Sequence, residues 1–296
     1  MFSPLALALT VALATSGGPV PPQALPAGRS ALDAPTASAV YPLRFDWKRD
    51  ALLTGGSAAL LLSSELLFKD ALAPESCRWC DRNAQGEDTL PAIDRWGTGI
   101  AGDAQAQESA RKWSNVVTLA VLPAGVFGTG YLVARNSGAS GSQLSEDALM
   151  VGQAVVFSSL TNQAVKFLVA RERPFVHQMT PEERAQGEHS EDDNLSFYSG
   201  HSNVAFALVA STATVARLRG YRHHEWVWIV GLPIATAVPL LRMAAGKHYL
   251  TDVAVGAVMG TAFGIAVPLL LHPRLEKAPP LTVSAGLGTV MFSGTF

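Results

Sequence analysis

The amino-acid sequence predicts an all-α protein, a six-helix bundle that associates with a membrane or spans it. Apolar residues make up 48% of the 296-residue chain and charged residues only 16%, whereas an average soluble domain is roughly 25% charged. The mean hydropathy is +0.21. Six apolar segments recur along the chain, and most reach or approach the ~20 residues that cross a bilayer as a helix. None alternates polar and apolar residues as a half-buried strand would.

The six predicted helices occupy residues 51–68, 114–134, 148–170, 203–217, 226–241 and 250–271. Small residues recur within them. In the last segment, Gly256, Gly260 and Gly264 are spaced four apart, which places them on one face of the helix. This spacing favours close approach of a neighbouring helix, in a membrane or in a soluble bundle.

Outside the helical domain, assigned to 50–273, the chain changes character at both ends. Residues 1–14 are apolar and then give way to small polar residues, which indicates a signal peptide or an uncleaved N-terminal anchor. Residues 15–49 are rich in Pro, Ala, Gly and Ser and predict a flexible linker. The C-terminal tail, 274–296, alternates roughly from residue 281 onward, which predicts a short β-like end.

Two polar stretches separate the predicted helices. The first, 69–113, contains the two cysteines of the chain, Cys77 and Cys80. A zinc site would need two further ligands, and only Asp81 is near, so no metal site is predicted. In an oxidising compartment the cysteines would form a disulfide; the alternative is two free thiols. The second stretch, 175–196, is acidic and is interpreted as a solvated loop rather than a site.

Basic residues suggest a membrane topology. They follow or precede the apolar segments at Arg44, Lys48, Arg49, Arg135, Arg217, Arg219, Arg222, Arg274 and Lys277. If all six segments span, these groups share one side, expected to be cytoplasmic, and 69–113, 171–202 and 242–250 face outward. A cleaved signal peptide would instead export the basic groups, so the two alternatives stay open. The net charge of −2, without a long basic run, argues against a nucleic-acid partner.

Three polar clusters lie at the ends of apolar segments. The first reads Lys166-Phe-Leu-Val-Ala-Arg-Glu-Arg173-Pro174. Charged side chains beside an apolar helix are costly unless they meet an anion. An arginine can grip two phosphate oxygens at once, and a lysine adds a point charge. Lys166 and Arg173 therefore indicate an anion site; the alternative is that both side chains snorkel at a membrane edge.

The second cluster is Ser196-Phe-Tyr-Ser199-Gly200-His201-Ser202, immediately before an apolar helix. Backbone N–H groups at a helix start bind anions, and Gly200 allows close approach of the backbone. Ser199 could donate a hydrogen bond, and His201 could exchange a proton with a leaving group. The alternative is an ordinary serine N-cap beside an uninvolved histidine.

The third cluster is Arg242-Met-Ala-Ala-Gly-Lys-His248-Tyr-Leu-Thr-Asp252. On a helix, residues four apart lie one turn from each other, so Asp252 is expected beneath His248. A carboxylate bonded to one ring nitrogen would leave the other free to attack. Arg242 adds another cation. The alternative is a structural His–Asp pair.

Taken in order, Lys-x6-Arg-Pro, Ser-Gly-His and Arg-x5-His-x3-Asp resemble the motifs of the type 2 phosphatidic acid phosphatase (PAP2) superfamily, over roughly residues 110–271. Tyr198 stands where a proline often precedes the serine, and Leu241 where a serine often precedes the arginine. The resemblance implies that phosphate is held by Lys166, Arg173, Ser199, Gly200 and Arg242. It further implies that His248 is the nucleophile, Asp252 its orienting partner and His201 the acid.

The resemblance implies a phosphatase without metal or cofactor, in a fold of the PAP2/haloperoxidase type. His248 would form a phosphohistidine while His201 protonates the departing oxygen, and water would then release phosphate. A neutral His248 and a protonated His201 predict a bell-shaped pH profile. The expected substrate is a lipid phosphate, a polyprenyl diphosphate or a small phosphate ester, reached at the outer face of the cell envelope. Alternatives are a vanadium-dependent haloperoxidase, a phosphotransferase, or a non-catalytic membrane protein of the same fold.

Overall fold

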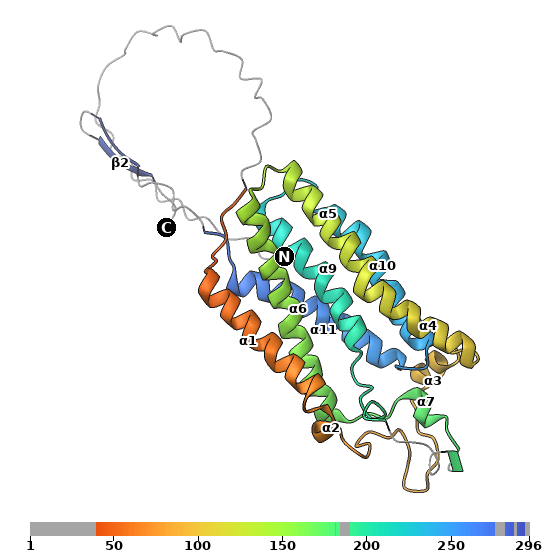
Figure 1. Ribbon diagram of the computed structural model, residues 1–296. Coiled ribbons are helices and arrows are strands. Elements are labelled where there is room, and N and C mark those ends of the chain that lie inside the picture. Colours follow the sequence, from red (N-terminus) through yellow and green to blue (C-terminus); the bar gives the residue numbers. More distant parts are fainter. Residues whose placement is uncertain (1–39, 181, 184–189, 276–281, 287–288, 294–296) are drawn as a thin grey trace. The chain divides into compact units, whose positions relative to one another are not determined.

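The computed structural model describes residues 40–180, 182–183, 190–275, 282–286 and 289–293 (Figure 1). The predicted signal peptide or anchor, and the linker up to residue 39, lie outside the described residues. The last residues of the predicted flexible linker are instead attached to the helical domain, because Tyr41 and Arg44 hydrogen-bond to it. Their backbone N–H groups donate to the Arg219 and Pro273 carbonyls at 2.9 Å. The first helix also begins before residue 50, at Trp47, capped by the Asp46 side chain.

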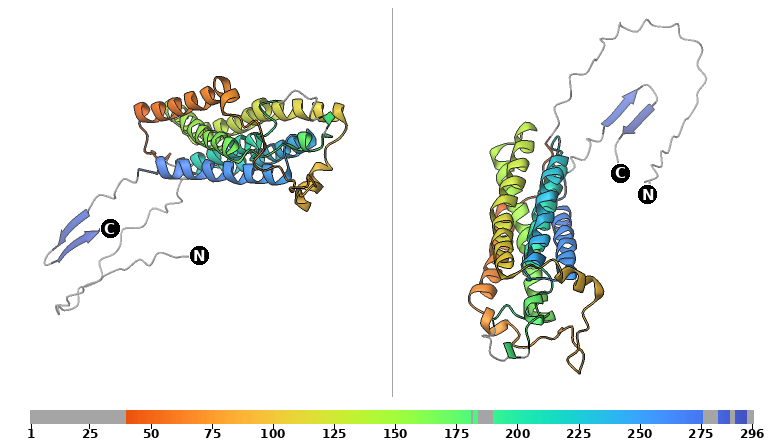
Figure 2. Two further views of the ribbon diagram at one scale, coloured as in Figure 1. Left: turned by 90° about the horizontal axis from the view of Figure 1, so that it is seen from below. Right: turned by 90° about the vertical axis from the view of Figure 1, so that its right-hand side faces the viewer.

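Six long helical segments lie side by side and confirm the predicted all-α fold (Figures 1 and 2). They are α1 (Trp47–Leu66), the continuous run α4 (Ala104–Val116), η1 (Val117–Val121) and α5 (Leu122–Asn136), then α6 (Gly141–Val169), α9 (Gly200–Arg219), α10 (Glu225–Ala244) and α11 (Leu250–Leu271). Three short helices, α2 (Lys69–Leu72), α3 (Ala92–Thr98) and α7 (Pro174–His177), gather with their loops at one end of the bundle. Each long helix contains one of the predicted apolar segments or most of it.

Local sequence signals set the ends of α6 and α9. Helix α9 starts after Ser199, whose side chain accepts from the Ser202 N–H, and stops at Gly220 in the left-handed conformation. Helix α6 starts at a capping box formed by Ser140 and Gln143. The last turns of α6 and α10 and the first turns of α9 and α11 lie at the same end of the bundle. The polar clusters of the sequence therefore meet there.

Helix α9 is the central element, with most of its residues buried by its neighbours. The glycines of α11 explain how closely that helix approaches it. A Cβ on Gly256, Gly260 or Gly264 would collide with backbone carbonyl oxygens of α9, those of Ser199, Asn203 and Ala207 respectively. The predicted close packing along this glycine face is confirmed, and its partner is α9.

Three stretches among the described residues are long and apolar enough to cross a membrane: Ala104–Asn136, Glu225–Ala244 and Leu250–Leu271. Large apolar side chains such as Leu119, Val258 and Leu270 project from them with 66–73% of their surface exposed. Exposed apolar area of this extent indicates contact with lipid, so the protein is membrane-associated. The sequence suggested up to six spans; α9, for example, falls short because its buried faces carry Ser, Thr and Asn residues.

The predicted β-like end is present as a two-stranded antiparallel hairpin. Strand β1 (Thr282–Gly286) pairs with β2 (Thr289–Ser293), with Thr282 opposite Ser293.

Candidate active site

The structure brings the three polar clusters together where helices α6, α9, α10 and α11 meet. Lys166 lies in the last turn of α6, and Gly200 is the first residue of α9. Arg242 lies in the last turn of α10, and Asp252 in the first turn of α11. The antiparallel arrangement of the bundle thus assembles residues that are up to 86 positions apart, 166 to 252, at one end.

Gly200 leaves room for two polar side chains of α6. A Cβ at this position would lie 3.5 Å from Lys166 Nζ and 3.0 Å from Asn162 Oδ1. Any other residue would therefore crowd the Asn162 amide and contact the ammonium group. Ser199, fully buried beside it, caps α9 through its Oγ, while its own N–H donates to the Asp252 carbonyl at 3.0 Å.

The two predicted phosphate-binding arginines are buried, and their donors are incompletely used. Arg173 donates from Nε to the Asp192 carbonyl at 2.7 Å and, at 3.4 Å, from Nη1 to the Lys247 carbonyl. Arg242 donates from Nη1 to Ser114 Oγ at 3.3 Å, and its buried Nε finds no partner among the described residues. Buried donors of this kind are costly unless something accepts from them, which fits a site that receives an anion.

His248 differs from expectation in its surroundings. It does not stand on a helix with Asp252, because α11 begins at Leu250. Its Nδ1 lies 2.8 Å from the Ser196 carbonyl oxygen and 3.7 Å from Asp252 Oδ2. A carbonyl oxygen only accepts, so Nδ1 must carry the proton in this contact. Nε2 then has a free lone pair, so the ring is in the tautomer that lets Nε2 act as a nucleophile.

Charge and burial keep the His248 imidazole neutral. The side chain is buried in the loop between α10 and α11, and burial lowers its pKa well below the usual 6.5. The positive charges of Arg173, Arg242 and Lys166 lower it further. A neutral imidazole surrounded by cations can attack an electrophile that carries negative charge.

Asp252 is held by groups other than His248. Its Oδ1 accepts from Arg171 Nη1 at 2.7 Å, and its Oδ2 accepts from Ser196 Oγ at 2.5 Å and from the Tyr249 N–H at 3.0 Å. The carboxylate is fully buried. Ser196 contacts both residues, since its hydroxyl donates to Asp252 and its carbonyl accepts from His248 Nδ1. The orienting role expected for Asp252 stays a prediction.

His201, in the first turn of α9, reaches across to the helix run of α4. Its Nε2 lies 2.8 Å from Asn115 Oδ1. With the amide oxygen as acceptor, His201 carries a proton on Nε2, the atom that would deliver it to a leaving group. Burial and the charges of Arg242, Lys166 and Arg173 lower the pKa of His201 to about 3, so without a bound anion the imidazole is neutral, contrary to the protonated state predicted from the sequence. Sequence reasoning did not find Asn115, since an asparagine inside an apolar segment carries no motif of its own.

Three further residues at the site were missed or interpreted differently. Arg171 and Ser196 stand inside the first and second clusters, and their roles depend on contacts with Asp252. Asp192 belongs to the stretch 175–196, interpreted as a solvated loop. That interpretation is wrong for this residue, because its backbone carbonyl accepts from Arg173 and its carboxylate lies 3.6 Å from the same guanidinium.

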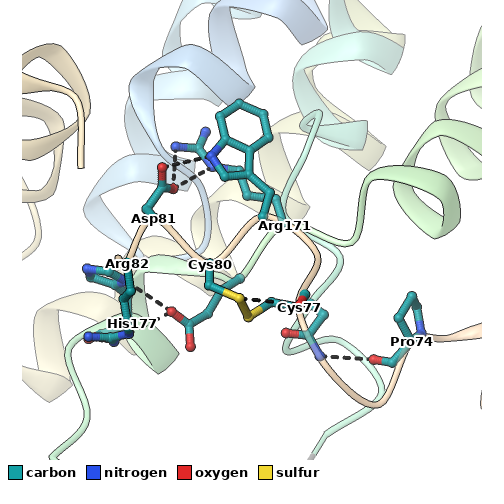
Figure 3. Close-up of a disulfide and its surroundings, with 10 residues drawn as sticks. Pro74, Cys77, Cys80, Asp81, Arg82, Arg171 and His177 are labelled. Atoms are coloured by element: carbon teal, nitrogen blue, oxygen red, sulfur yellow. Dashed lines mark hydrogen bonds and ion pairs between the residues drawn. A yellow bond between two sulfur atoms is a disulfide. The ribbon is translucent and has the colours of Figure 1, made fainter. Parts of the chain in front are cut away.

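The loop at this end also contains the disulfide between Cys77 and Cys80, which confirms the first of the two alternatives for these cysteines (Figure 3). Among the described residues no cluster of three His, Cys, Asp or Glu side chains is arranged to hold a metal ion.

The structure thus gathers cations and two histidines at one end of a membrane-associated helix bundle, a setting that suits an anion. The model of the PAP2 superfamily matches residues 147–276, a stretch that includes every predicted catalytic and phosphate-binding residue and confirms the resemblance. A search of solved structures finds the crystal structure of the first transmembrane PAP2 type phosphatidylglycerolphosphate phosphatase from Bacillus subtilis, at 19% identity, TM-score 0.41, covering 75% of this chain and 94% of that one. No curated protein matches.

Proposed function

We propose that this protein is a phosphatase that needs no metal ion and works through a phosphohistidine on His248. The observation that carries the proposal is the electrostatic setting of His248: a buried, neutral imidazole whose pKa is lowered by burial and by Arg173, Arg242 and Lys166. The same three cations would offset the charge of a bound phosphate and of its transition state. The match to the PAP2 superfamily supports a function of the phosphatase type.

The proposed reaction has two displacements at phosphorus. In the first, His248 Nε2 attacks in line, an N–P bond forms, and the bond to the ester oxygen breaks. His201, which takes up a second proton when the bound phosphate offsets the charges of the nearby cations, gives its Nε2 proton to that oxygen and becomes neutral imidazole, so the alcohol leaves neutral. In the second, His201 removes a proton from water, the resulting hydroxide attacks phosphorus, and the N–P bond breaks to release phosphate. His248 and His201 then return to their starting states.

We place the substrate among phosphate monoesters or diphosphates of lipids or polyprenols. Exposed apolar side chains on the candidate spans support this choice, because they put the bundle in contact with a bilayer. A membrane-embedded substrate would then approach the site along the helices. A water-soluble ester is the alternative that the substrate panel below distinguishes.

We further propose that the site faces outward in the cell envelope. The disulfide lies at the same end as the site, and disulfides persist in oxidising compartments. Basic residues lie at the other end: Arg274 donates from Nε to the Leu218 carbonyl and from Nη2 to the Arg217 carbonyl, both at 2.6 Å. Positive residues favour the cytoplasmic side.

The test of activity is phosphate release by purified protein in detergent, from paired lipid and soluble esters, with and without EDTA. We expect turnover in EDTA, inhibition by vanadate, and an acid-labile phosphoryl group on the protein after quenching. Loss of activity in EDTA that a divalent ion restores would contradict the proposal. Bromide oxidation with added vanadate, without phosphate release, would favour the haloperoxidase alternative instead.

The test of sidedness uses single cysteines in a chain whose Cys77 and Cys80 are serine. One replaces the exposed Glu75 at the site end and the other replaces Gly138 at the opposite end. An impermeant thiol reagent on intact cells is expected to label the Glu75 position alone. Labelling at Gly138 alone would place the site in the cytoplasm, and labelling at both would indicate an exported protein without spanning helices.

A further inference from the structure

Arg171 lies between Lys166 and Arg173 in sequence, yet its surroundings are unlike those of a phosphate ligand. The side chain is fully buried. Nε and Nη2 both donate to Asp81 Oδ2, at 3.1 and 2.9 Å, and Nη2 also donates to Asp94 Oδ2 at 2.7 Å. Nη1 donates to Asp252 Oδ1 at 2.7 Å and to Thr251 Oγ1 at 2.8 Å. A guanidinium has five N–H groups, and five bonds use them all, so none remains for a substrate.

Two aromatic rings contact the guanidinium as well. The Trp79 and Tyr249 rings each lie with their centroids 4.1 Å from Arg171 Cζ. Stacking of this kind suits the planar guanidinium and not the compact ammonium of lysine. Arg171 is therefore fixed in position and orientation by aromatic rings as well as by carboxylates.

A short chain of contacts leads from Arg171 to the proposed nucleophile. Arg171 holds Oδ1 of Asp252, and Oδ2 of that carboxylate accepts from Ser196 Oγ at 2.5 Å. The Ser196 carbonyl accepts from His248 Nδ1, while the Ser196 N–H donates to the Arg171 carbonyl at 3.0 Å. Ser196 is thus held from both sides, and the His248 ring takes its orientation from it.

The opposite side of Arg171 faces the disulfide loop. Figure 3 shows Asp81 bonded to Arg171, next to the Cys77–Cys80 bridge. Trp79 joins this loop to the strand-like segment after α6, because the Glu172 N–H donates to the Trp79 carbonyl at 3.1 Å. The same tryptophan donates from Nε1 to Asp81 at 2.7 Å.

We infer that Arg171 is a positioning residue: it clamps Asp252 against Ser196, so that His248 keeps its attacking nitrogen aimed, and it ties this arrangement to the disulfide loop through Asp81 and Trp79. As a statement about the reaction, the inference rests on the proposed phosphatase function. As a statement about the orientation of His248, it stands by itself.

The first experiment compares Arg171→Lys with Arg82→Lys in phosphate release. Arg82 is a matched control in the same loop, paired with the buried Glu172 at 3.5 Å and away from Asp252. Lysine at 171 keeps the charge but cannot reach three carboxylates. We expect kcat to fall at least tenfold with KM within twofold of the wild type, and Arg82→Lys to leave both unchanged. A rise in KM at constant kcat, or equal losses of kcat in both variants, would overturn the inference.

A second variant guards against misfolding of the first. Asp81→Asn leaves Arg171 in place and weakens its clamp from the side remote from His248. We expect a fall in kcat of a few fold, in the same direction as for Arg171→Lys and again without a change in KM. Wild-type kcat in a folded Asp81→Asn protein would count against the link to the disulfide loop and overturn that part of the inference.

A readout independent of turnover is the titration of the His248 imidazole by ¹⁵N NMR in detergent micelles. The charged or titratable groups that face His248 are Lys166, Arg173, His201, Arg242 and Asp252, and none is altered in Arg171→Lys. Release of Asp252 would let its carboxylate stabilise the imidazolium, so the pKa of His248 should rise. An unchanged titration would overturn the inference, whereas a shift in a protein whose wild type hydrolyses no ester would overturn only the proposed function.

Discussion

The two ends of the bundle treat buried arginines in different ways. Near the end opposite the site, Arg219 is buried and donates from Nε to Asp147 at 2.7 Å and from Nη2 to Glu146 at 2.6 Å. Tyr221 completes the group by donating to the second oxygen of Asp147. At the site end, Arg242 is similarly buried, but its one hydrogen bond within the part of the chain that the structure describes is 3.3 Å long and goes to the neutral hydroxyl of Ser114.

This difference separates a structural cation from one that awaits a ligand. A buried charge is tolerable when carboxylates and hydrogen bonds complete it within the fold. Arg219 meets that condition, and so does Arg171. Arg242 does not, because among the described residues no carboxylate pairs with it and its Nε has no partner. An anion bound beside it would supply the missing acceptors.

The largest effect is expected from removing the proposed nucleophile. In His248→Ala, turnover should fall by at least about 10³-fold, because no other group can form the covalent intermediate. No phosphoryl group should then be trapped on the protein. The matched control is His272→Ala, another buried histidine, whose Nε2 lies 2.9 Å from Gln153 Oε1 outside the site. Comparable turnover in the two variants would contradict the mechanism.

The comparison of the two ends predicts opposite outcomes for two arginine variants. Arg242→Gln should lower kcat/KM about 10²-fold, the usual cost of a lost transition-state donor, with the folded state intact. Arg219→Gln leaves two carboxylates without their cation, so it should lower the free energy of unfolding by about 3–5 kcal/mol and leave kcat/KM of the folded fraction unchanged. Thermal unfolding in detergent and steady-state kinetics measure both. If the two profiles were exchanged, the distinction between the ends would be wrong.

The pH dependence of kcat/KM tests the electrostatics of His248. Only the neutral imidazole attacks, and its pKa lies well below 6.5 because of burial and the nearby cations. As the pH is lowered, kcat/KM should therefore begin to fall through protonation of His248 only well below pH 6.5. Arg173→Gln removes one of these cations, raises the pKa and should move this acidic limb to higher pH. A limb at or above pH 6.5 that is the same in both proteins would assign it to another group.

The smallest effect is expected from the disulfide. Cys77 and Cys80 are three positions apart, and closing so short a loop contributes at most about 2 kcal/mol. The double serine variant should unfold slightly more easily and keep most of its kcat, since Arg171 still holds Asp81 and Asp252. Denaturation in detergent with parallel kinetics measures this. Complete loss of activity in a folded variant would mean that the bridge itself shapes the site.

Much of the fold follows from local patterns along the chain. The length of the apolar segments predicted the six long helices, and the last segment, 250–271, coincides with α11. The spacing of Gly256, Gly260 and Gly264 predicted a close helix contact, because glycines four apart must share a face. The motifs around Lys166 and His201 predicted residues that the structure brings together, since each of these clusters lies at the end or the start of a helix.

Partner choice was decided only in three dimensions. Spacing suggested that Asp252 would orient His248 directly, but a helix start at Leu250 and the carbonyl of Ser196, 52 positions away, give the ring a different acceptor. The sequence likewise shows Arg171 as one more basic residue between Lys166 and Arg173. Its true partners, Asp81, Asp94 and Asp252, come from three distant segments. Helix formation depends on neighbours within a few residues, so the sequence determines it; a buried guanidinium takes the carboxylates that the packed bundle brings within reach, so only the tertiary structure could assign them.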